Sequence, residues 1–223
     1  MWVYSALSDS ACRTEVLHYG IWRVLEDAHN PPAVGWLSVP PGIMDAMTRT
    51  VDVAVATVPT PVGRIRLAVT AAGLAGLTWE GRELPGADLP PAADPDRLAP
   101  VTRQLTDYFQ GQRRGFELSI DWRHVDGTQR RVLQTLYSSV GYGESITYGE
   151  LAQRSGTGVP ARGIGAIMGS NPIPLVVPCH RVVAHDGLGG YSGGVDGNGL
   201  EVKRWLLTLE GVLPPTFDWP AFP

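Results

Sequence analysis

The sequence is poor in cysteine, and it lacks any long apolar run. Its two cysteines, Cys12 and Cys179, are far apart and in unlike surroundings, which excludes a disulfide framework or a cysteine-rich zinc site and suits a reducing cytoplasm. No apolar stretch reaches the roughly 18 residues that a membrane span needs. The amino terminus lacks the basic-then-apolar layout of a secretory signal. We therefore expect a cytoplasmic protein without a membrane segment.

The sequence also lacks a large excess of either positive or negative charge. Eighteen Lys and Arg residues face 22 Asp and Glu residues, for a net charge of −4, so overall charge gives no indication of a nucleic-acid partner. The 223 residues are 43% hydrophobic, which is enough for the core of one domain or two small ones.

The chain divides by pattern. Residues 1–49 lack sustained periodicity and are predicted to form a poorly structured extension, although Ser10 to Asp27 is compatible with one helix. We expect an amino-terminal domain over 50–122, a second domain over 126–211 and a tail over 212–223.

The first domain shows the two-residue period of strands. Apolar residues alternate from Val51, from Ile65 and around Leu74 to Trp79, with turns between them, and this predicts a small antiparallel sheet. Apolar residues at helical spacing predict a helix over 98–108. Phe116 to Ile120 alternates again and predicts one further strand.

The second domain is predicted to be mainly helical. Its expected helices cover 128–140, a short segment opened by a Thr147-x-x-Glu150 capping box, 161–169 and 200–210. The two short central helices have helix-turn-helix spacing, a motif of nucleic-acid binders that also occurs as a simple packing unit.

Chemistry is concentrated at Pro178-Cys179-His180-Arg181. The run Ile173 to Val177 contains Pro174 and is flanked by Pro172 and Pro178, so it is expected to be a short extended segment. A thiol near its usual pKa is mostly protonated at neutral pH, so a nucleophilic cysteine needs a base or cationic neighbours, which His180 and Arg181 can supply. On these four residues alone, a buried structural cysteine is an equal alternative.

Several further segments carry a resemblance to a known family. Together with Pro178 to Val182, the segments 146–152, 168–172, 191–194 and 203–207 occur in an order that resembles the O6-alkylguanine-DNA alkyltransferases. The likeness covers roughly residues 50–211 and is strongest from Tyr142 onward. It implies an α/β (α+β) fold: a ribonuclease-H-like antiparallel sheet domain, then a helical DNA-binding alkyltransferase domain.

The resemblance implies an irreversible reaction in DNA repair. An alkyl group would move from O6 of guanine to the sulfur of Cys179. By analogy His180, acting through a water, takes the thiol proton, Glu210 orients His180, and the Tyr148 hydroxyl assists the departing guanine. No cofactor is expected. We also expect no metal, because the zinc ligands found in the amino-terminal domain of some relatives are not evident in this sequence.

The resemblance also implies a partner, double-stranded DNA containing O6-alkylguanine, bound by a monomer. The lesion base would be flipped out of the duplex, and the second short helix would enter the minor groove. Arg162 matches the arginine that fills the space left by the base, and Asn171 the asparagine that ties this helix to the active-site segment. The residues matching the base pocket are Val182, Tyr191 and Ser192, with Pro174 as a neighbouring wall.

Two other functions stay open at this point. A non-catalytic protein that binds alkylguanine-DNA and flags it for other repair would not need Cys179, and a cysteine hydrolase would need turnover. One departure from the family pattern bears on the site, because Val195 to Gly199 resembles an insertion between the glycine-rich loop and the last helix.

Overall fold

The computed structural model describes residues 12–17, 21–26, 52–85, 91–92, 94–125 and 127–215. The chain divides into two units, residues 1–49 and 50–223. In the first unit, strands β1 (Cys12–Leu17) and β2 (Ile21–Glu26) pair antiparallel. The single helix expected there is therefore wrong, because two segments rich in β-branched and aromatic residues satisfy their backbone groups against each other. The rest of the predicted extension lies outside the described residues.

The second unit begins with a four-stranded sheet in the order β5-β4-β3-β6. Strands β3 (Val53–Thr60), β4 (Gly63–Thr70) and β5 (Gly73–Trp79) form an antiparallel meander, and β6 (Pro91–Ala92) pairs parallel with β3. The two-residue period predicted these three longer strands and their turns. Strand β5 is buried along nearly its whole length, so both of its faces are covered.

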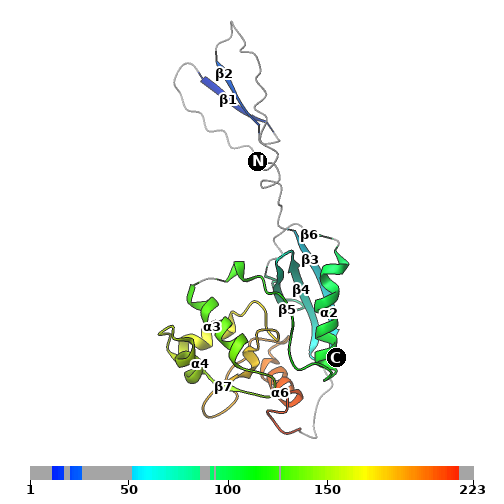
Figure 1. The fold of residues 1–223 in the computed structure, drawn as a ribbon, viewed down its shortest axis with the longest axis vertical. Helices are drawn as coiled ribbons and strands as arrows, with labels where there is room; N and C mark the ends of the chain where they lie inside the picture. The colour runs from blue at the N-terminus through cyan, green and yellow to red at the C-terminus, as the bar shows by residue number, and fades with distance from the viewer. Residues whose placement is uncertain are drawn as a thin grey trace. The chain divides into compact units, whose positions relative to one another are not determined.

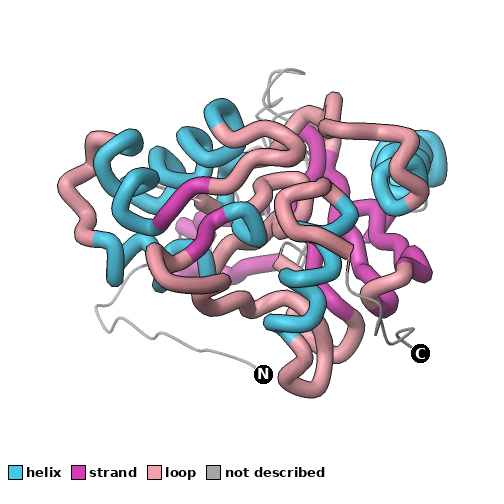
Figure 2. The backbone as a smooth tube through the Cα atoms, turned by 90° about the horizontal axis from the view of Figure 1, so that it is seen from below, coloured by secondary structure: helices cyan, strands magenta, loops and turns pink. Residues whose placement is uncertain are grey.

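Helix α2 (Pro95–Phe109) packs against β3 and β4, while α3 to α6 lie beyond β5 (Figure 1, Figure 2). The buried residues of α2, which are Val101, Leu105 and Tyr108, follow the predicted helical spacing. One hydrophobic cluster runs from the sheet through α2 into the carboxyl-terminal helices. The sheet is thus the support against which the rest of the unit is built.

Residues 116–120 do not form the predicted strand. They meet β5 through one parallel bridge between Leu74 and Ile120, and the backbone of Glu117 pairs instead with the Gln104 side chain of α2, at 2.8 and 3.1 Å. A side-chain amide can satisfy both backbone groups of one residue, and here it replaces a neighbouring strand. A one-turn helix, η1 (Trp122–His124), follows.

The remaining elements are short. Their bounds are α3 (Gly127–Ser139), β7 (Ile146–Thr147), α4 (Tyr148–Ser155), α5 (Ala161–Gly169), η2 (Cys179–Arg181), β8 (Val182–Val183) and α6 (Gly199–Leu209). The predicted capping box is present, with Thr147 and Glu150 bonded reciprocally, and Gly156 ends α4 in the left-handed conformation. Helices α4 and α5 pack together, and β7 pairs parallel with β8. None of the helices in the described ranges is long and apolar enough to cross a membrane.

Candidate active site

The segment before the cysteine forms a hydrogen-bonded turn, and the extended segment expected from its prolines is wrong. Leu175 has a φ of 71°, and the Val177 N–H donates to the Ile173 carbonyl at 2.9 Å. The Asn171 side chain holds the turn from inside: its Nδ2 donates to the Val177 carbonyl at 2.8 Å, and its Oδ1 accepts from the Ile173 N–H at 3.1 Å. These local bonds override the extended preference and deliver Cys179 at the start of η2.

Cys179 is buried, with 4% of its surface exposed. Burial raises the pKa of its thiol to about 11, although a hydrogen bond from Asn171 and the charge of Lys203 act in the opposite direction. A thiol in this state is protonated at neutral pH. It becomes a nucleophile only when a neighbouring base accepts its proton.

The histidine next in sequence is tied to a buried carboxylate. His180 Nε2 lies 2.9 Å from Glu210 Oε1, and Arg181 donates to both oxygens of Glu210, from Nε to Oε2 at 2.8 Å and from Nη2 to Oε1 at 2.9 Å. Burial alone would raise the pKa of Glu210, but the charges and hydrogen bonds of His180 and Arg181 outweigh it and lower the pKa to about 2. Glu210 is therefore an ionised acceptor.

This geometry fixes the tautomer of His180. An ionised carboxylate only accepts, so Nε2 carries the hydrogen and Nδ1 presents a lone pair. Burial lowers the pKa of His180, although Glu210 opposes it, and the imidazole is neutral at neutral pH. Its Nδ1 is buried without a hydrogen-bond partner. Nδ1 of His180, the residue next to the cysteine, is therefore free to accept a proton.

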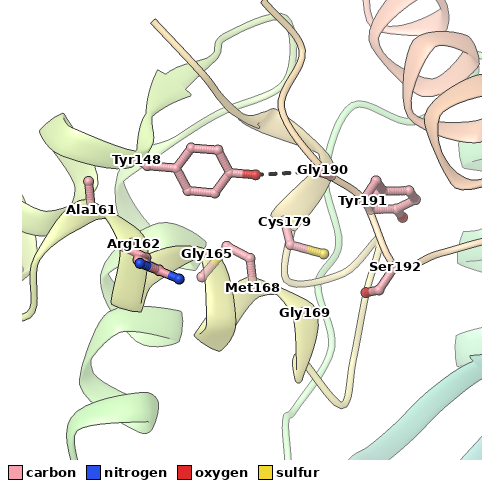
Figure 3. Close-up of a pocket in the computed structure, with 10 residues that line it drawn as sticks. All are labelled: Tyr148, Ala161, Arg162, Gly165, Met168, Gly169, Cys179, Gly190, Tyr191 and Ser192. Atoms are coloured by element: carbon pink, nitrogen blue, oxygen red, sulfur yellow. Dashed lines mark hydrogen bonds between the residues drawn. The ribbon is translucent and has the colours of Figure 1, made fainter.

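A pocket of about 560 Å³ opens beside the thiol (Figure 3). Helix α5 forms one side, with Arg162, Gly165 and Met168. Residues 190–192 of the glycine-rich loop, which runs from Gly187 to Gly194, face it across Cys179. The lining is mostly apolar, which suits a flat aromatic ligand with a few polar contacts. The complete set of lining residues is Tyr148, Ala161, Arg162, Gly165, Met168, Gly169, Cys179, Gly190, Tyr191 and Ser192.

Three comparisons with known proteins give the same result. Two models of 6-O-methylguanine DNA methyltransferase match, the ribonuclease-like domain over residues 53–122 and the DNA-binding domain over 127–212. A methylated-DNA–protein-cysteine methyltransferase of Mycolicibacterium paratuberculosis is 37% identical over 155 residues, which cover 69% of this chain and 90% of that protein. The chain belongs to the 6-O-methylguanine DNA methyltransferase family.

Further members of this methyltransferase family agree in sequence and fold. One from Methanopyrus kandleri is 42% identical over 131 residues, or 59% of this chain and 94% of that protein. The crystal structure of Mycobacterium tuberculosis O6-methylguanine methyltransferase has a TM-score of 0.61 and 33% identity over 74% of this chain and 96% of that one. A structure of the mycobacterial protein in complex with DNA has a TM-score of 0.60 and 34% identity over 72% and 92%. The resemblance and the fold class expected from the sequence are confirmed.

The methyltransferase fold brings most of the predicted site residues together. Cys179, Tyr148, Arg162, Tyr191 and Ser192 line one pocket. The predicted partners His180 and Glu210 lie in hydrogen-bond contact behind the thiol, and Asn171 holds the turn that leads to it.

Val182, predicted for the base pocket, and Pro174, predicted as a neighbouring wall, are not among the residues that line this pocket. Val182 is fully buried, and the structure does not place it on this pocket, because its strand β8 pairs with β7 in the core. Pro174 lines an adjoining depression of about 540 Å³ that shares Gly169 and Ser192 with the pocket.

Tyr148 stands at the first turn of α4 and points its ring into the pocket (Figure 3). Its hydroxyl donates to the Gly190 carbonyl at 3.3 Å. Burial raises the pKa of Tyr148, and the charge of a Cys179 thiolate would raise it further. The phenol therefore keeps its proton and remains a donor.

Two residues of this methyltransferase site were not predicted from the sequence. Lys203 is fully buried, and its Nζ donates to the carbonyls of Val182 at 2.6 Å and Gly190 at 3.0 Å. A lysine at helical spacing from Leu206 and Leu207 was a usable signal. The other is Tyr108, whose hydroxyl donates to Glu210 Oε1 at 2.7 Å across 102 positions of sequence. Its helical spacing predicted burial but gave no partner.

The segment predicted as an insertion forms a closed turn. Asp196 and Gly197 have φ values of 50° and 82°, and Asn198 Oδ1 accepts from the Val195 N–H at 2.9 Å. Helix α6 begins directly afterwards at Gly199, and Glu210 still reaches His180.

Proposed function

We propose that this chain repairs DNA by moving an alkyl group irreversibly from O6 of a guanine in duplex DNA to Sγ of Cys179. The observation that carries the proposal is the buried thiol at the pocket, backed by a neutral His180 whose Nδ1 is unpartnered. Family members in the mouse and the rat are named methylated-DNA–protein-cysteine methyltransferases. The enzyme class proposed for this chain is the same.

The residues present account for each proton in the reaction. His180 Nδ1 takes the thiol proton through a water, and Glu210 stabilises the resulting imidazolium. The thiolate attacks the alkyl carbon in line, the C–S bond forms, and the C–O bond to guanine breaks with its electron pair on the base. Tyr148 donates a hydrogen bond or a proton to the guanine as charge develops there. The thioether is stable, so one chain reacts once.

The DNA contacts follow from the pocket wall. We propose that α4 and α5 act as a helix-turn-helix, with α5 in the minor groove, because the small residues Gly165 and Ala166 permit a close approach to the backbone. Arg162 is exposed at the rim of the pocket and can occupy the stack after the base has been flipped. Val182 and Pro174 have supporting roles behind this wall. A monomer would suffice for this function, since all these groups come from one chain. We propose that it acts in the cytoplasm.

The test is intact-protein mass spectrometry after incubation with a duplex containing O6-methylguanine. We expect a gain of one methyl group, mapped to the peptide of Cys179, and no gain in Cys179→Ser. Cys12→Ser is the matched control and should gain the same mass as the wild type. Lesion binding without a mass gain would favour a non-catalytic alkylguanine-binding protein, and release of more than one product per chain would favour a hydrolase.

A further inference from the structure

Tyr108 lies outside the pocket yet contacts the proton-accepting pair. It is the second-last residue of α2, its side chain is fully buried, and its ring packs against Phe109, Phe116 and Tyr142. Its hydroxyl donates to Glu210 Oε1 at 2.7 Å. A phenylalanine at this position would fill the same space in the aromatic cluster. Packing therefore does not explain why a hydroxyl group contacts Glu210.

The oxygen that Tyr108 contacts is the one that serves His180. Glu210 Oε1 accepts from Tyr108 Oη, His180 Nε2 and Arg181 Nη2, whereas Oε2 accepts from Arg181 Nε. Arg181 already grips both oxygens and holds the orientation of the carboxylate. Tyr108 adds a donor to the one oxygen whose charge decides how strongly His180 is held.

We propose that Tyr108 is a positioning residue that acts through Glu210, its hydroxyl competing with His180 for the same carboxylate oxygen and so keeping the imidazole neutral until the thiol proton arrives. The role of Tyr108 in catalysis rests on the proposed alkyl transfer. The effect of Tyr108 on the pKa of His180 does not depend on that function.

The direction of the effect follows from the donor count. A hydrogen bond into Oε1 draws negative charge from the carboxylate and weakens its hold on an imidazolium. Without the hydroxyl, Glu210 stabilises protonated His180 more strongly, and the histidine takes up a proton at higher pH. An imidazolium cannot accept the thiol proton, so transfer fails at the acid end of the pH range.

Several elements contribute ionisable groups around the pair of His180 and Glu210. The titratable and charged groups that face His180 and Glu210 are Tyr108 from α2, Tyr142 from the turn after α3, Cys179 and Arg181 from η2, Tyr191 from the glycine-rich loop and Lys203 from α6. Burial and the charge of Glu210 raise the pKa of Tyr108 well above its usual value, so it donates throughout the range in which His180 titrates.

The experiment measures the His180 titration directly, by NMR of the full chain labelled with 15N-histidine. The five histidines are distinguished by the loss of one signal in His180→Gln. In Tyr108→Phe we expect the pKa of His180 to rise by about half a unit or more. Placing 3-fluorotyrosine at position 108, which has a more acidic phenol, should shift it downward.

Tyr142→Phe is the matched control. It removes a phenol hydroxyl from the same aromatic cluster, but that hydroxyl donates to the Leu209 carbonyl at 2.8 Å and not to the carboxylate. An unchanged His180 titration in both Tyr108 variants would overturn the proposal, as would equal shifts in Tyr108→Phe and Tyr142→Phe.

Single-turnover transfer to the protein supplies the functional arm. The acid limb of the rate against pH should move upward in Tyr108→Phe by the NMR shift, while the plateau stays within about twofold. At pH values below the limb, the shift corresponds to a loss of about threefold or more. A limb that stays in place while the NMR value moves would overturn the link to the thiol. If the wild type transfers no alkyl group, the proposed function fails while the NMR arm still decides the role of Tyr108.

Discussion

At the scale of single residues, the site is dominated by groups whose ionisation is changed by burial. Lys203 is one such group. Burial lowers its pKa to about 8, although the charge of a Cys179 thiolate would act against this, while an unfolded lysine titrates near 10.5. Below the lower value, the folded chain holds a charged ammonium group away from water, and its two carbonyl contacts only partly offset that cost.

The sign of the pH dependence follows. Between pH 8 and 9 the unfolded chain keeps a proton on Lys203 that the folded chain loses, so the free energy of unfolding rises with pH. Compared with Lys203→Met, the wild type should gain about 1 kcal/mol over that interval. Chemical denaturation of both proteins at the two pH values measures it, and Cys179 titrates in both and cancels. A difference independent of pH would contradict the assigned pKa.

At the same scale, sequence reasoning reached the reacting groups together with Glu210 and Asn171, but it did not reach Lys203 or Tyr108. Cys179 and His180 are adjacent in the chain, so their chemistry is local and could be predicted. The roles of Lys203 and Tyr108 depend on partners that only the folded chain brings close. A pattern of apolar positions predicts that such a side chain is buried, but it does not predict which atom the polar end will meet.

At the scale of elements, the glycine-rich loop shapes the pocket through close approach. Gly189 has a φ of 67°, and a Cβ placed there would lie 2.8 Å from Cε2 of Tyr148. Gly189→Ala should therefore displace the Tyr148 ring and slow transfer by roughly ten- to a hundredfold. Gly187→Ala in the same loop meets nothing within 4 Å and is the matched control, expected within about twofold of the wild type. Single-turnover rates decide, and equal rates in both variants would rule out this role for the loop.

The elements that were predicted correctly are those specified by nearby residues. The Thr147–Glu150 capping box and the alternating strands need only local sequence. The two errors in the second unit, residues 116–120 and 173–177, share one cause: the side chains of Gln104 and Asn171 take backbone partners that a strand would otherwise use. Periodicity does not register such competition.

At the scale of the whole molecule, the part that matches the ribonuclease-like domain and the part that matches the DNA-binding domain share one core. The hydrophobic cluster includes Leu105 of α2 and Leu206 of α6, both fully buried. Strand β5 also donates from the Leu77 N–H to the Pro172 carbonyl at 2.9 Å, directly ahead of the turn that carries Cys179. The sheet is therefore physically continuous with the active-site segment.

A shared core predicts that the two parts unfold together. Leu105→Ala should lower the free energy of unfolding by about 2–5 kcal/mol, through lost burial and the cavity left behind. Hydrogen exchange followed by mass spectrometry should show the same loss of protection in peptides of β4 and in peptides of α3, although Leu105 belongs to α2. Faster exchange in β4 with α3 unchanged would mean two independently folding domains. Tyr108 and His180 would then belong to two domains that can unfold separately. The acid limb of the transfer rate against pH would in that case depend on the stability of the amino-terminal domain.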